Sequence, residues 1–239
     1  VRFFRELYRE LRGRGPKLLR EDFCGTFGVC CEWVKLGPDF HAYGRDLSAE
    51  AVAYGTKNYL PKLTPEQRGR VKIERKDVLT PGGPKSDLIM AMNFSYCLFK
   101  KRTELKAYFA NCLKNLRPDG VLALDCFGGG GVQRPNNERT VHPRFVYYWE
   151  QLDFDPVYNI ARCAMHFKPN GRKKIKNVFT YDWRVWTIPE IRELLAEVGF
   201  RKSHVYWEGD DGKHGNGKFA RDENGGREDI WIAMLMAEK

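Results

Sequence analysis

The stretch LLREDFCGTFG (residues 18–28) decides the fold of this chain. Residues 18–23 have the pattern of a strand that runs into a loop, and VCCEWVKL (29–36) has the pattern of a helix. Glu21 ends the strand, and Gly25 stands in the turn, where a residue without a side chain lets the backbone approach a ligand closely. The free N–H groups at the start of a helix suit an anionic or strongly dipolar group. The stretch therefore predicts a strand–turn–helix unit that binds a ligand at its turn.

Two further acidic residues stand at the ends of the next two predicted strands. HAYGRD (41–46) ends in Asp46, and VKIERK (71–76) is followed by Asp77. In nucleotide-binding sheets, the first of these positions accepts hydrogen bonds from ribose hydroxyls, and an acid one strand further can accept from the adenine amino group. Taken singly, each acid also fits a solvated strand end or a helix cap. Together with Glu21 they predict a ligand-binding edge at the C-terminal ends of three strands.

Strand and helix patterns alternate through the first half of the chain. Ser48 caps a predicted helix that runs to about Asn58. SDLIMAM (86–92) and VLALDCF (121–127) are apolar runs typical of strands covered on both faces, and LKAYFANCLKNL (105–116) between them has helical spacing. This alternation predicts an α/β fold with a parallel sheet and helices on both faces.

The alternation stops after Gly128–Gly131 and resumes at Thr187, which opens a helix with the capping box TIPE. Three aromatic-rich strands without intervening helices are predicted between these points, at residues 145–152, 157–167 and 176–186. They should form an antiparallel meander. Two closing strands, SHVYWE (203–208) and DIWIAMLMA (229–237), flank a polar, glycine-rich loop at 209–228.

The length and composition exclude several classes of protein. The 239 residues suffice for one large domain or two small ones. Hydrophobic residues make up 42% and charged residues 30%, which excludes a disordered chain and a collagen-like repeat. No apolar run approaches the roughly 18–20 residues of a membrane span, and VRFFRELYRE (1–10) lacks the pattern of a signal peptide. We therefore expect a globular protein with no membrane partner.

Charge and cysteine content bear on partners and compartment. Lys and Arg number 41 against 31 Asp and Glu, so the formal net charge is +10, which permits an anionic ligand, a nucleic acid or an acidic surface. The seven cysteines form no CxxC pair, and Cys97, Cys112 and Cys126 sit inside apolar runs. This pattern predicts buried, reduced thiols in a cytoplasmic protein without a metal site.

Six segments resemble the class I S-adenosylmethionine-dependent methyltransferases. In chain order they are EDFCGTFG (21–28), RDLS (45–48), KDVLT (76–80), SDLIMAMNFSY (86–96), LRPDGVLALDCF (116–127) and WTIPEIRELLAEVGF (186–200). They resemble the glycine-rich first motif, the ribose and adenine motifs, the strand where substrate meets cofactor, the turn before strand five, and the last helix. The resemblance implies a three-layer, Rossmann-like α/β sheet with strand order 3-2-1-4-5-7-6 and strand seven antiparallel.

The same resemblance implies a division of the chain. Residues 1–127 and 187–239 would form the domain that binds S-adenosylmethionine. Residues 128–186 would form an antiparallel β insert after strand five that belongs to the same domain and roofs the acceptor site.

S-adenosylmethionine is the implied cofactor, and S-adenosylhomocysteine is its product. The implied binding residues are Arg20, Glu21, Cys24, Gly25, Thr26, Asp46, Leu47, Asp77, Val78, Asn93 and Phe94. Asp46 would hold the ribose, Asp77 would lie near the adenine amine, and residues 24–26 would contact the cofactor through their backbone. Arg20 either reaches the carboxylate of the methionine moiety or pairs with Glu21 or Asp22.

The first motif departs from the family pattern E/DxGxGxG. Phe23 and Phe27 stand at the first and third glycine positions, only Gly25 is retained, and Gly28 lies one step beyond the frame. The loop should therefore be bulkier than usual.

The segment NFSY (93–96) stands where nucleic-acid amino-methyltransferases carry NPPY. Asn93 and Tyr96 match that motif, but the two prolines that shape the base-gripping loop are absent. We therefore expect Asn93 and Phe94 to flank the cofactor. Tyr96, together with Asn93, is the expected catalytic residue that positions the acceptor.

The insert and the late loop suggest the kind of acceptor. Aromatic residues of the insert could form a cage around a cationic amine or fill the core between the insert and the main sheet; they are Tyr147, Tyr148, Trp149, Trp183 and Trp186. His142 and His166 are candidate bases, although a lone histidine is more often structural. The loop 209–228, with Asp210 and Asp211, is either a lid over a cationic acceptor or an inert surface excursion.

The expected activity is methyl transfer to the N or O nucleophile of a small molecule, cationic or aromatic, by in-line displacement. The enzyme mainly positions the acceptor and excludes water, so the lack of an obvious catalytic dyad is no objection. The alternative is a methyltransferase acting on RNA, DNA or protein, although no specific nucleic acid is expected because no separate RNA-binding module is visible. A nucleotide-binding module without catalysis, or a nicotinamide-dependent oxidoreductase, is a third class, but G-x-G-x-x-G is absent.

Overall fold

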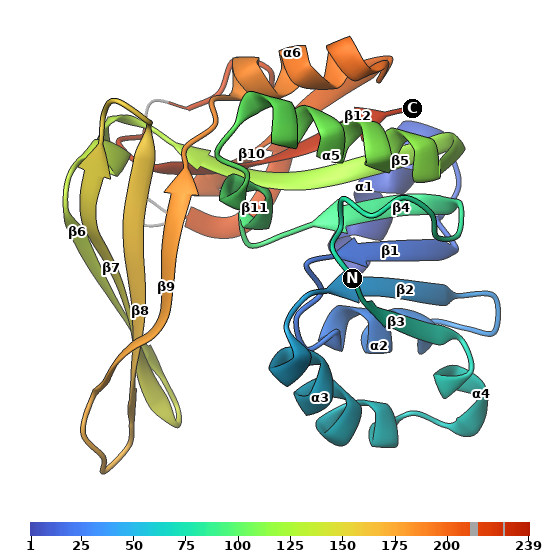
Figure 1. Cartoon of the computed structure of the whole chain (residues 1–239), viewed down its shortest axis with the longest axis horizontal. Coiled ribbons are helices and arrows are strands. Elements are labelled where there is room, and N and C mark those ends of the chain that lie inside the picture. Colours follow the sequence, from blue (N-terminus) through green and yellow to red (C-terminus); the bar gives the residue numbers. More distant parts are fainter. Residues whose placement is uncertain (211–214, 227) are drawn as a thin grey trace.

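Eight strands form one mixed sheet in the order β11-β10-β12-β5-β4-β1-β2-β3 (Figure 1). The computed structural model describes residues 1–210, 215–226 and 228–239. The strands of this sheet are β1 (Leu18–Asp22), β2 (His41–Asp46), β3 (Val71–Arg75), β4 (Ser86–Ala91), β5 (Leu116–Gly128), β10 (Lys202–Asp210), β11 (Gly215–Arg221) and β12 (Trp231–Glu238). Strands β1 to β5 are parallel to one another, so their C-terminal ends meet at one edge of the sheet.

The order confirms the predicted fold class. The run β3-β2-β1-β4-β5-β12-β10 corresponds to 3-2-1-4-5-7-6, and β12 is antiparallel to both β5 and β10. The eighth strand, β11, extends the sheet beyond this pattern.

Helices cover both faces of the sheet, which gives the three predicted layers. They are α1 (Arg2–Arg12), α2 (Gly28–Val34), α3 (Ala49–Asn58), α4 (Pro65–Arg68), α5 (Arg102–Asn115) and α6 (Ile188–Val198), with 3-10 turns η1 (Leu60–Lys62), η2 (Ser95–Leu98) and η3 (Gly130–Gln133). On one face, α1 and α2 bury Tyr8 and Trp33 in a hydrophobic cluster. On the other face, α5 and α6 bury Phe109 and Leu194 in a second cluster.

The connection from β3 to β4 contains no helix, although parallel strands are usually linked through one. The Arg45 side chain of β2 holds this connection by hydrogen bonds. Its guanidinium donates hydrogen bonds to the carbonyl oxygens of Thr80 at 2.6 Å and Gly82 at 2.9 Å. These bonds satisfy backbone acceptors that a helix would satisfy internally.

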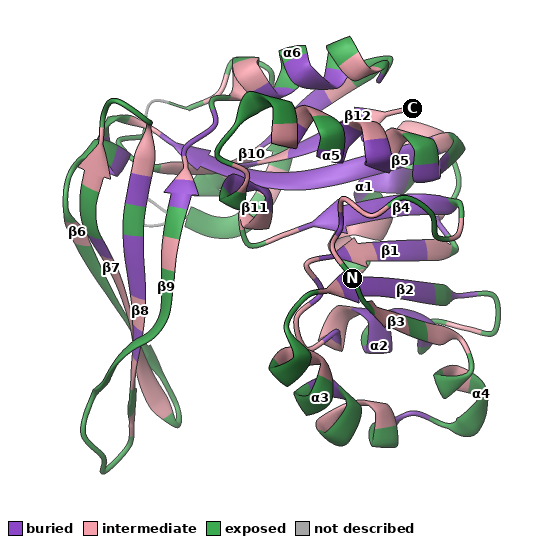
Figure 2. Cartoon of the chain, in the orientation of Figure 1, coloured by how far each residue is buried: buried purple, intermediate pink, exposed green. Residues whose placement is uncertain are grey.

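A second, antiparallel sheet of order β6-β7-β8-β9 follows β5. Its strands are β6 (Asn136–His142), β7 (Phe145–Asp155), β8 (Ile160–Pro169) and β9 (Ile175–Arg184). Figure 1 shows that the C-terminal ends of the parallel strands face this sheet. The sequence predicts three of the four strands; β6 escapes prediction because six of its seven residues are exposed and the apolar alternation is missing. Figure 2 shows the contrast between the buried β4 and β5 and the exposed β6.

The segment 209–228 is not the continuous loop that the sequence predicts. β10 continues to Asp210, and β11 pairs with it in antiparallel register, with Phe219 opposite Glu208. The apolar Phe219 gives this polar strand an anchor, because its ring lies 5.4 Å from that of Phe3 in α1. The expectation of an irregular loop is therefore wrong for 215–221, whereas its role as a lid stays a prediction. Asp211 lies outside the described residues.

All seven cysteines are buried and form no disulfide, as the sequence predicts. In the described part of the chain, no helix is long and apolar enough to cross a membrane. The same residues contain no group of three or more His, Cys, Asp and Glu that could hold a metal ion.

Candidate cofactor and acceptor site

The loop after β1 contains three left-handed residues. Phe23, Gly25 and Phe27 have φ angles of 55°, 52° and 48°. These are the three glycine positions of the methyltransferase first motif. A left-handed conformation costs a residue with a side chain roughly 1–2 kcal/mol. The two phenylalanines thus adopt a backbone conformation that glycine adopts freely.

Packing of the buried Phe27 ring and of the half-buried Phe23 ring offsets this strain. Phe27 is fully buried, and Gly55 of α3 makes room for it, since a Cβ at Gly55 would lie 2.5 Å from the ring. The Phe23 ring lies 5.8 Å from that of Tyr108 in α5. Gly25 differs, because a Cβ there would meet no atom within 4 Å. The backbone at Gly25 therefore borders open space in which a ligand fits.

Asp46 joins the end of β2 to this loop. Its Oδ2 accepts a hydrogen bond from the Gly25 N–H at 2.7 Å, and its Oδ1 accepts one from the Ser48 N–H at 2.8 Å. The Cys24 N–H donates to the Arg45 carbonyl at 3.0 Å and forms a second link. The structure therefore brings the expected ribose-binding acid beside the glycine of the loop.

The remaining predicted residues at the ends of β2 and β3 differ in exposure. Leu47 is 66% exposed, whereas the Val78 side chain is buried in the cluster beneath α5. Asp77 accepts a hydrogen bond from the Leu79 N–H at 2.8 Å through one carboxylate oxygen. Its carboxylate has further lone pairs for another donor.

Glu21, at the end of β1, points toward α2. Its Oε2 accepts from the N–H of Cys30 at 3.2 Å and from the Cys30 thiol at 3.0 Å. Burial raises the pKa of Glu21 to about 7, although the two contacts with Cys30 act to lower it. Glu21 therefore supports the start of α2 and titrates near neutral pH.

Arg20 takes the second of its two predicted roles. Its side chain is fully buried, and its Nε donates to Asp22 Oδ1 at 2.8 Å. Asp22 Oδ2 also accepts from the Tyr108 hydroxyl at 3.1 Å. An approach of Arg20 to a cofactor carboxylate is not available in this structure, because the side chain lies beneath α5. Its two terminal nitrogens have no hydrogen-bond partner among the described residues.

A second left-handed turn follows β4. Asn93 and Phe94 have φ angles of 59° and 55°. Asp125 of β5 holds both, because its carboxylate accepts from the Asn93 N–H at 2.7 Å and from the Phe94 N–H at 2.9 Å. Burial raises the pKa of Asp125 to about 6, and the two backbone donors act to lower it. The sequence analysis missed Asp125, whose signal is an acid inside the apolar run LALDCF (122–127).

Tyr96 does not reach the surface where an acceptor would bind. It is fully buried in the cluster beneath α5, and its hydroxyl has no hydrogen-bond partner among the described residues. The expectation that Tyr96 positions the acceptor is corrected accordingly. The 3-10 turn η2 turns its side chain inward, whereas Asn93 is exposed.

The two candidate histidines have structural environments. His166 is buried, with its Nε2 2.7 Å from Glu150 and its Nδ1 accepting from the Asn177 N–H at 2.8 Å. His142 is exposed and packs on Phe145, with ring centroids 4.6 Å apart. Neither lines the cavity described next.

An aromatic cavity of about 460 Å³ lies between the turn after β4 and the second sheet. Its walls are formed by Asn93, Phe94, Ser95, Leu98, Phe127, Glu138, Tyr147, Trp149, Met165, Tyr181, Trp183, Ile230 and Ile232. Three of the five expected cage residues, Tyr147, Trp149 and Trp183, are therefore in place. Tyr148 and Trp186 are not: Tyr148 lies under the Lys174 ammonium, and the buried Trp186 donates to the Phe99 carbonyl.

A neighbouring cavity of about 820 Å³ shares Glu138, Ile230 and Ile232 with the aromatic cavity. Among the described residues, its lining adds three further acids, Glu208, Asp210 and Glu228, and one basic residue, Arg139. The described lining of this neighbouring cavity therefore holds more acids than bases, although the chain as a whole is basic.

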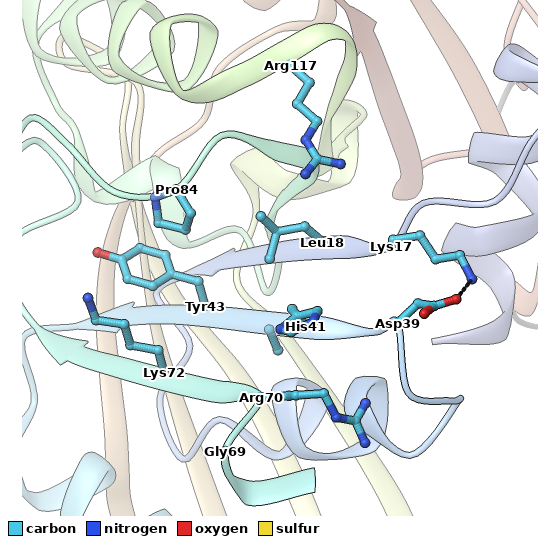
Figure 3. A pocket seen from close by; sticks show the side chains of 11 residues that line it. Lys17, Leu18, Asp39, His41, Tyr43, Gly69, Arg70, Lys72, Pro84 and Arg117 are labelled. Atoms are coloured by element: carbon cyan, nitrogen blue, oxygen red, sulfur yellow. Dashed lines mark hydrogen bonds and ion pairs between the residues drawn. The ribbon is translucent and has the colours of Figure 1, made fainter. Parts of the chain in front are cut away.

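A third cavity, of about 350 Å³, lies at the starts of β1 and β2, away from the strand ends that carry the predicted acids. Figure 3 shows Lys72 beside Tyr43 there, with Lys17, Arg70 and Arg117 at other points around the cavity. These cations already have partners: Lys17 pairs with Asp39 at 3.2 Å, for example, and Arg117 pairs with the buried Asp87 at 2.9 Å. We therefore place the functional site at the other edge of the sheet.

No protein-family model and no curated protein matches this chain. Solved structures do. CcbJ methyltransferase from Streptomyces caelestis is 14% identical, with 92% of this chain and 88% of that chain covered and a TM-score of 0.67. Sugar N-methyltransferase KedS8 from Streptoalloteichus is 18% identical, with 97% and 85% covered and a TM-score of 0.62.

A third structure, the S-adenosylmethionine-bound amino pentose methyltransferase CalS10 from Micromonospora echinaspora, is 15% identical. The match covers 98% of this chain and 89% of that chain, with a TM-score of 0.65. The chain therefore has the fold of the class I S-adenosylmethionine-dependent methyltransferases.

Proposed function

We propose that this chain is an S-adenosylmethionine-dependent methyltransferase that methylates an N or O nucleophile of a small molecule. The observation that carries the proposal is the left-handed loop 23–27, which Asp46 ties to β2 at the Gly25 N–H. The fold supports it, as do the printed names of the three similar structures, all methyltransferases.

The hydrogen-bonding groups at the strand ends fit this cofactor. Asp46 and Asp77 offer carboxylate oxygens to ribose hydroxyls and to an adenine amino group, and the open space at Gly25 admits a ligand against the backbone of residues 24–26. Leu47, Val78, Asn93 and Phe94 complete the proposed contacts. The bound cofactor supplies a methyl group made electrophilic by its sulfonium charge.

We propose that the aromatic cavity holds the acceptor. It begins at Asn93 and Phe94, which follow β4 on the edge where the predicted acids end their strands. Residues 128–186 then form the roof of this site within the same domain as residues 1–127 and 187–239. The roof excludes water and orients the nucleophile toward the cofactor, which is the main task of a methyltransferase.

The chemistry of the walls limits the choice of a base. Among the described residues that line the aromatic cavity, Glu138 is the one carboxylate. Burial, followed by the charge of Glu138, raises the pKa of Tyr147 to about 12, so this phenol stays protonated at neutral pH. An acceptor that must lose a proton would therefore pass it to Glu138. In this proposal Glu138 takes the place of Tyr96 as the residue that touches the acceptor.

The seven buried, unpaired thiols further suit a reducing compartment such as the cytoplasm. The net charge of +10 leaves methylation of RNA, DNA or protein as the second candidate function. Binding to RNA should be weak and should fade steeply with salt if the small-molecule proposal holds.

The test is release of S-adenosylhomocysteine from S-adenosylmethionine in parallel reactions with small amines, small phenols and acids, total RNA and a protein mixture. Turnover with a small molecule supports the proposal. Turnover confined to RNA or protein, or sub-micromolar sequence-selective RNA binding at physiological salt, would replace it with the second candidate.

A further inference from the structure

The aromatic cavity contains a cluster of five rings, which we call the aromatic box: Phe94, Phe127, Trp149, Tyr181 and Trp183. The ring centroid of Trp183 lies 4.4 Å from that of Tyr181, 5.6 Å from those of Phe94 and Trp149, and 5.8 Å from that of Phe127. The box therefore joins the turn after β4, strand β5 and the second sheet around Trp183.

Cations of the described residues lie over other rings of this protein, not over those of the box. Elsewhere in the molecule, Lys174 lies 4.1 Å from the centroid of Tyr148, and Arg184 lies 3.8 Å from that of Trp186. Among the described residues, no Lys or Arg is found over a ring of the box. The electron-rich ring faces that are not stacked on another ring of the box are thus left to an external ligand.

Glu138 places a carboxylate beside the box. It lies directly opposite Trp149 in the antiparallel register of β6 and β7, so both side chains project from the same face of the sheet. Its side chain accepts one weak hydrogen bond, from Asn136 at 3.3 Å. Within the described residues, neither Glu138 nor the nearby Glu208 and Glu228 forms an ion pair with Lys or Arg.

We propose that the acceptor is an alkylammonium compound, a small aliphatic amine whose charged nitrogen binds between the aromatic box and Glu138. This inference rests on the proposed methyltransferase function. Aromatic rings together with one carboxylate are the chemistry that recognises substituted ammonium ions. The acidic residues that line the neighbouring cavity attract the same cation and disfavour the phosphate of a nucleic acid.

The reaction balances at this site. The bound ammonium gives its proton to Glu138, which passes it to solvent. The freed nitrogen lone pair forms the N–CH3 bond while the S–CH3 bond breaks, and the bonding electron pair goes to sulfur. The product nitrogen is again cationic, because its lone pair is now shared in the N–CH3 bond, and a product that keeps an N–H gives that proton to Glu138 before the next transfer. The box therefore binds product as well as substrate, which allows successive methylation up to a quaternary ammonium ion.

Flat neutral acceptors would also stack in an aromatic cavity, so the test must isolate charge. Choline and 3,3-dimethylbutan-1-ol have the same shape and differ in the positive charge. We expect choline to quench the tryptophan fluorescence of the complex with S-adenosylhomocysteine, with an affinity about 10-fold above that of the neutral isostere. Glu138→Gln should lower choline affinity by roughly 3- to 10-fold and leave the isostere unchanged.

Two matched variants serve as controls. Glu193→Gln removes a carboxylate from the exposed face of α6 and should change neither affinity. Tyr148→Leu removes a ring from the opposite face of β7 and should also change neither, whereas Trp149→Leu should weaken choline binding. Thermal melting of each variant shows whether it is folded.

Equal affinity for choline and its isostere, no choline binding at millimolar concentration, or an unaltered ratio in Glu138→Gln overturns the inference. Calorimetry with S-adenosylhomocysteine on the same samples distinguishes a failure of the proposed acceptor class from a failure of the proposed methyltransferase function. If S-adenosylhomocysteine binds while charge has no effect, the acceptor class is wrong and the methyltransferase proposal stands. If S-adenosylhomocysteine does not bind, the proposed function fails first.

Discussion

The Asp46 carboxylate accepts a hydrogen bond from the backbone N–H of Gly25 at 2.7 Å. This contact joins the end of β2 to the loop after β1, where Phe23 and Phe27 flank the glycine. In the proposed site, one carboxylate therefore fixes the loop and faces the cofactor ribose at the same time.

Gly25→Ala tests whether the open space at this glycine belongs to the cofactor. The φ angle of 52° makes any side chain strained, so we expect a loss of folding stability of about 1 kcal/mol. The new methyl group would project into the space proposed for S-adenosylmethionine, so affinity should fall by more than this strain accounts for. Thermal melting and calorimetry with S-adenosylhomocysteine measure the two effects separately, and undiminished affinity would show that the ligand lies elsewhere.

Gly55→Ala tests how the phenylalanine-containing loop is packed. A Cβ at Gly55 would lie 2.2 Å from the Thr26 carbonyl oxygen and 2.5 Å from the Phe27 ring. We expect overpacking to destabilise the fold by about 1–3 kcal/mol in urea unfolding. Gly69→Ala is the matched control, because its nearest atoms lie at 3.6 Å and 3.7 Å. Equal stability of the two variants would contradict the packing of Phe27 against α3.

Much of this fold was predictable because local patterns and tertiary packing agree. The predicted helix starts at Ser48 and Thr187 have their capping hydrogen bonds, and the apolar runs at 86–92 and 121–127 form the buried centre of the sheet. Strand β11 was missed because its hydrogen bonds to β10 stabilise a polar, glycine-containing segment that has little strand propensity of its own.

The sequence predicts those parts of the site whose positions follow from the backbone of the sheet. It does not predict the parts that depend on the direction in which a side chain points. Asp46 and Gly25 meet because two parallel strands end side by side. Whether Tyr96 points to the core or to a cavity depends on the turn that Asp125 holds from a distant strand. The same holds for Glu138, which becomes a wall of the aromatic cavity through pairing of β6 with β7.

The stability of the protein should depend on the titration of Asp125. Burial raises the pKa of Asp125 to about 6 in the folded protein, whereas an aspartate in an unfolded chain has a pKa of about 3.9. Folding therefore takes up a proton between these values, and stability falls as pH rises through this window. Asp125→Asn should remove a change of up to about 3 kcal/mol between pH 4 and pH 6.5, measured by urea unfolding.

The wild type and Asp125→Asn are compared by how steeply the free energy of unfolding changes with pH. Its absolute value is not compared, because the amide also weakens the turn at 93–94. The pKa of Glu21 is also raised, to about 7, so its titration too lowers the free energy of unfolding as pH rises. This contribution extends to neutral pH and persists in Asp125→Asn. A variant slope identical to that of the wild type between pH 4 and pH 6.5 would show that Asp125 is ionised throughout.

Arg45→Lys tests the helix-free connection from β3 to β4. A lysine has one donor nitrogen in place of three, so it cannot bond Thr80 and Gly82 from two separate nitrogens while a third donates to Tyr43, as the guanidinium does. We expect a loss of about 1–3 kcal/mol and faster hydrogen exchange in the residues around this connection. Arg201→Lys, at an exposed site, serves as the control. Unchanged exchange across residues 76–85 would mean that Arg45 does not hold the connection.

The most direct measurement is calorimetric titration of S-adenosylhomocysteine into the wild type, Asp46→Ala and Asp39→Ala. The account predicts one site per chain and a loss of roughly 10- to 150-fold in Asp46→Ala, equivalent to about 1.5–3 kcal/mol for a charged hydrogen-bond partner. Asp39→Ala, which removes an aspartate at the opposite edge of the sheet, should bind as the wild type does. No binding by the wild type, or equal affinity in Asp46→Ala, would contradict the claim that this edge holds the cofactor.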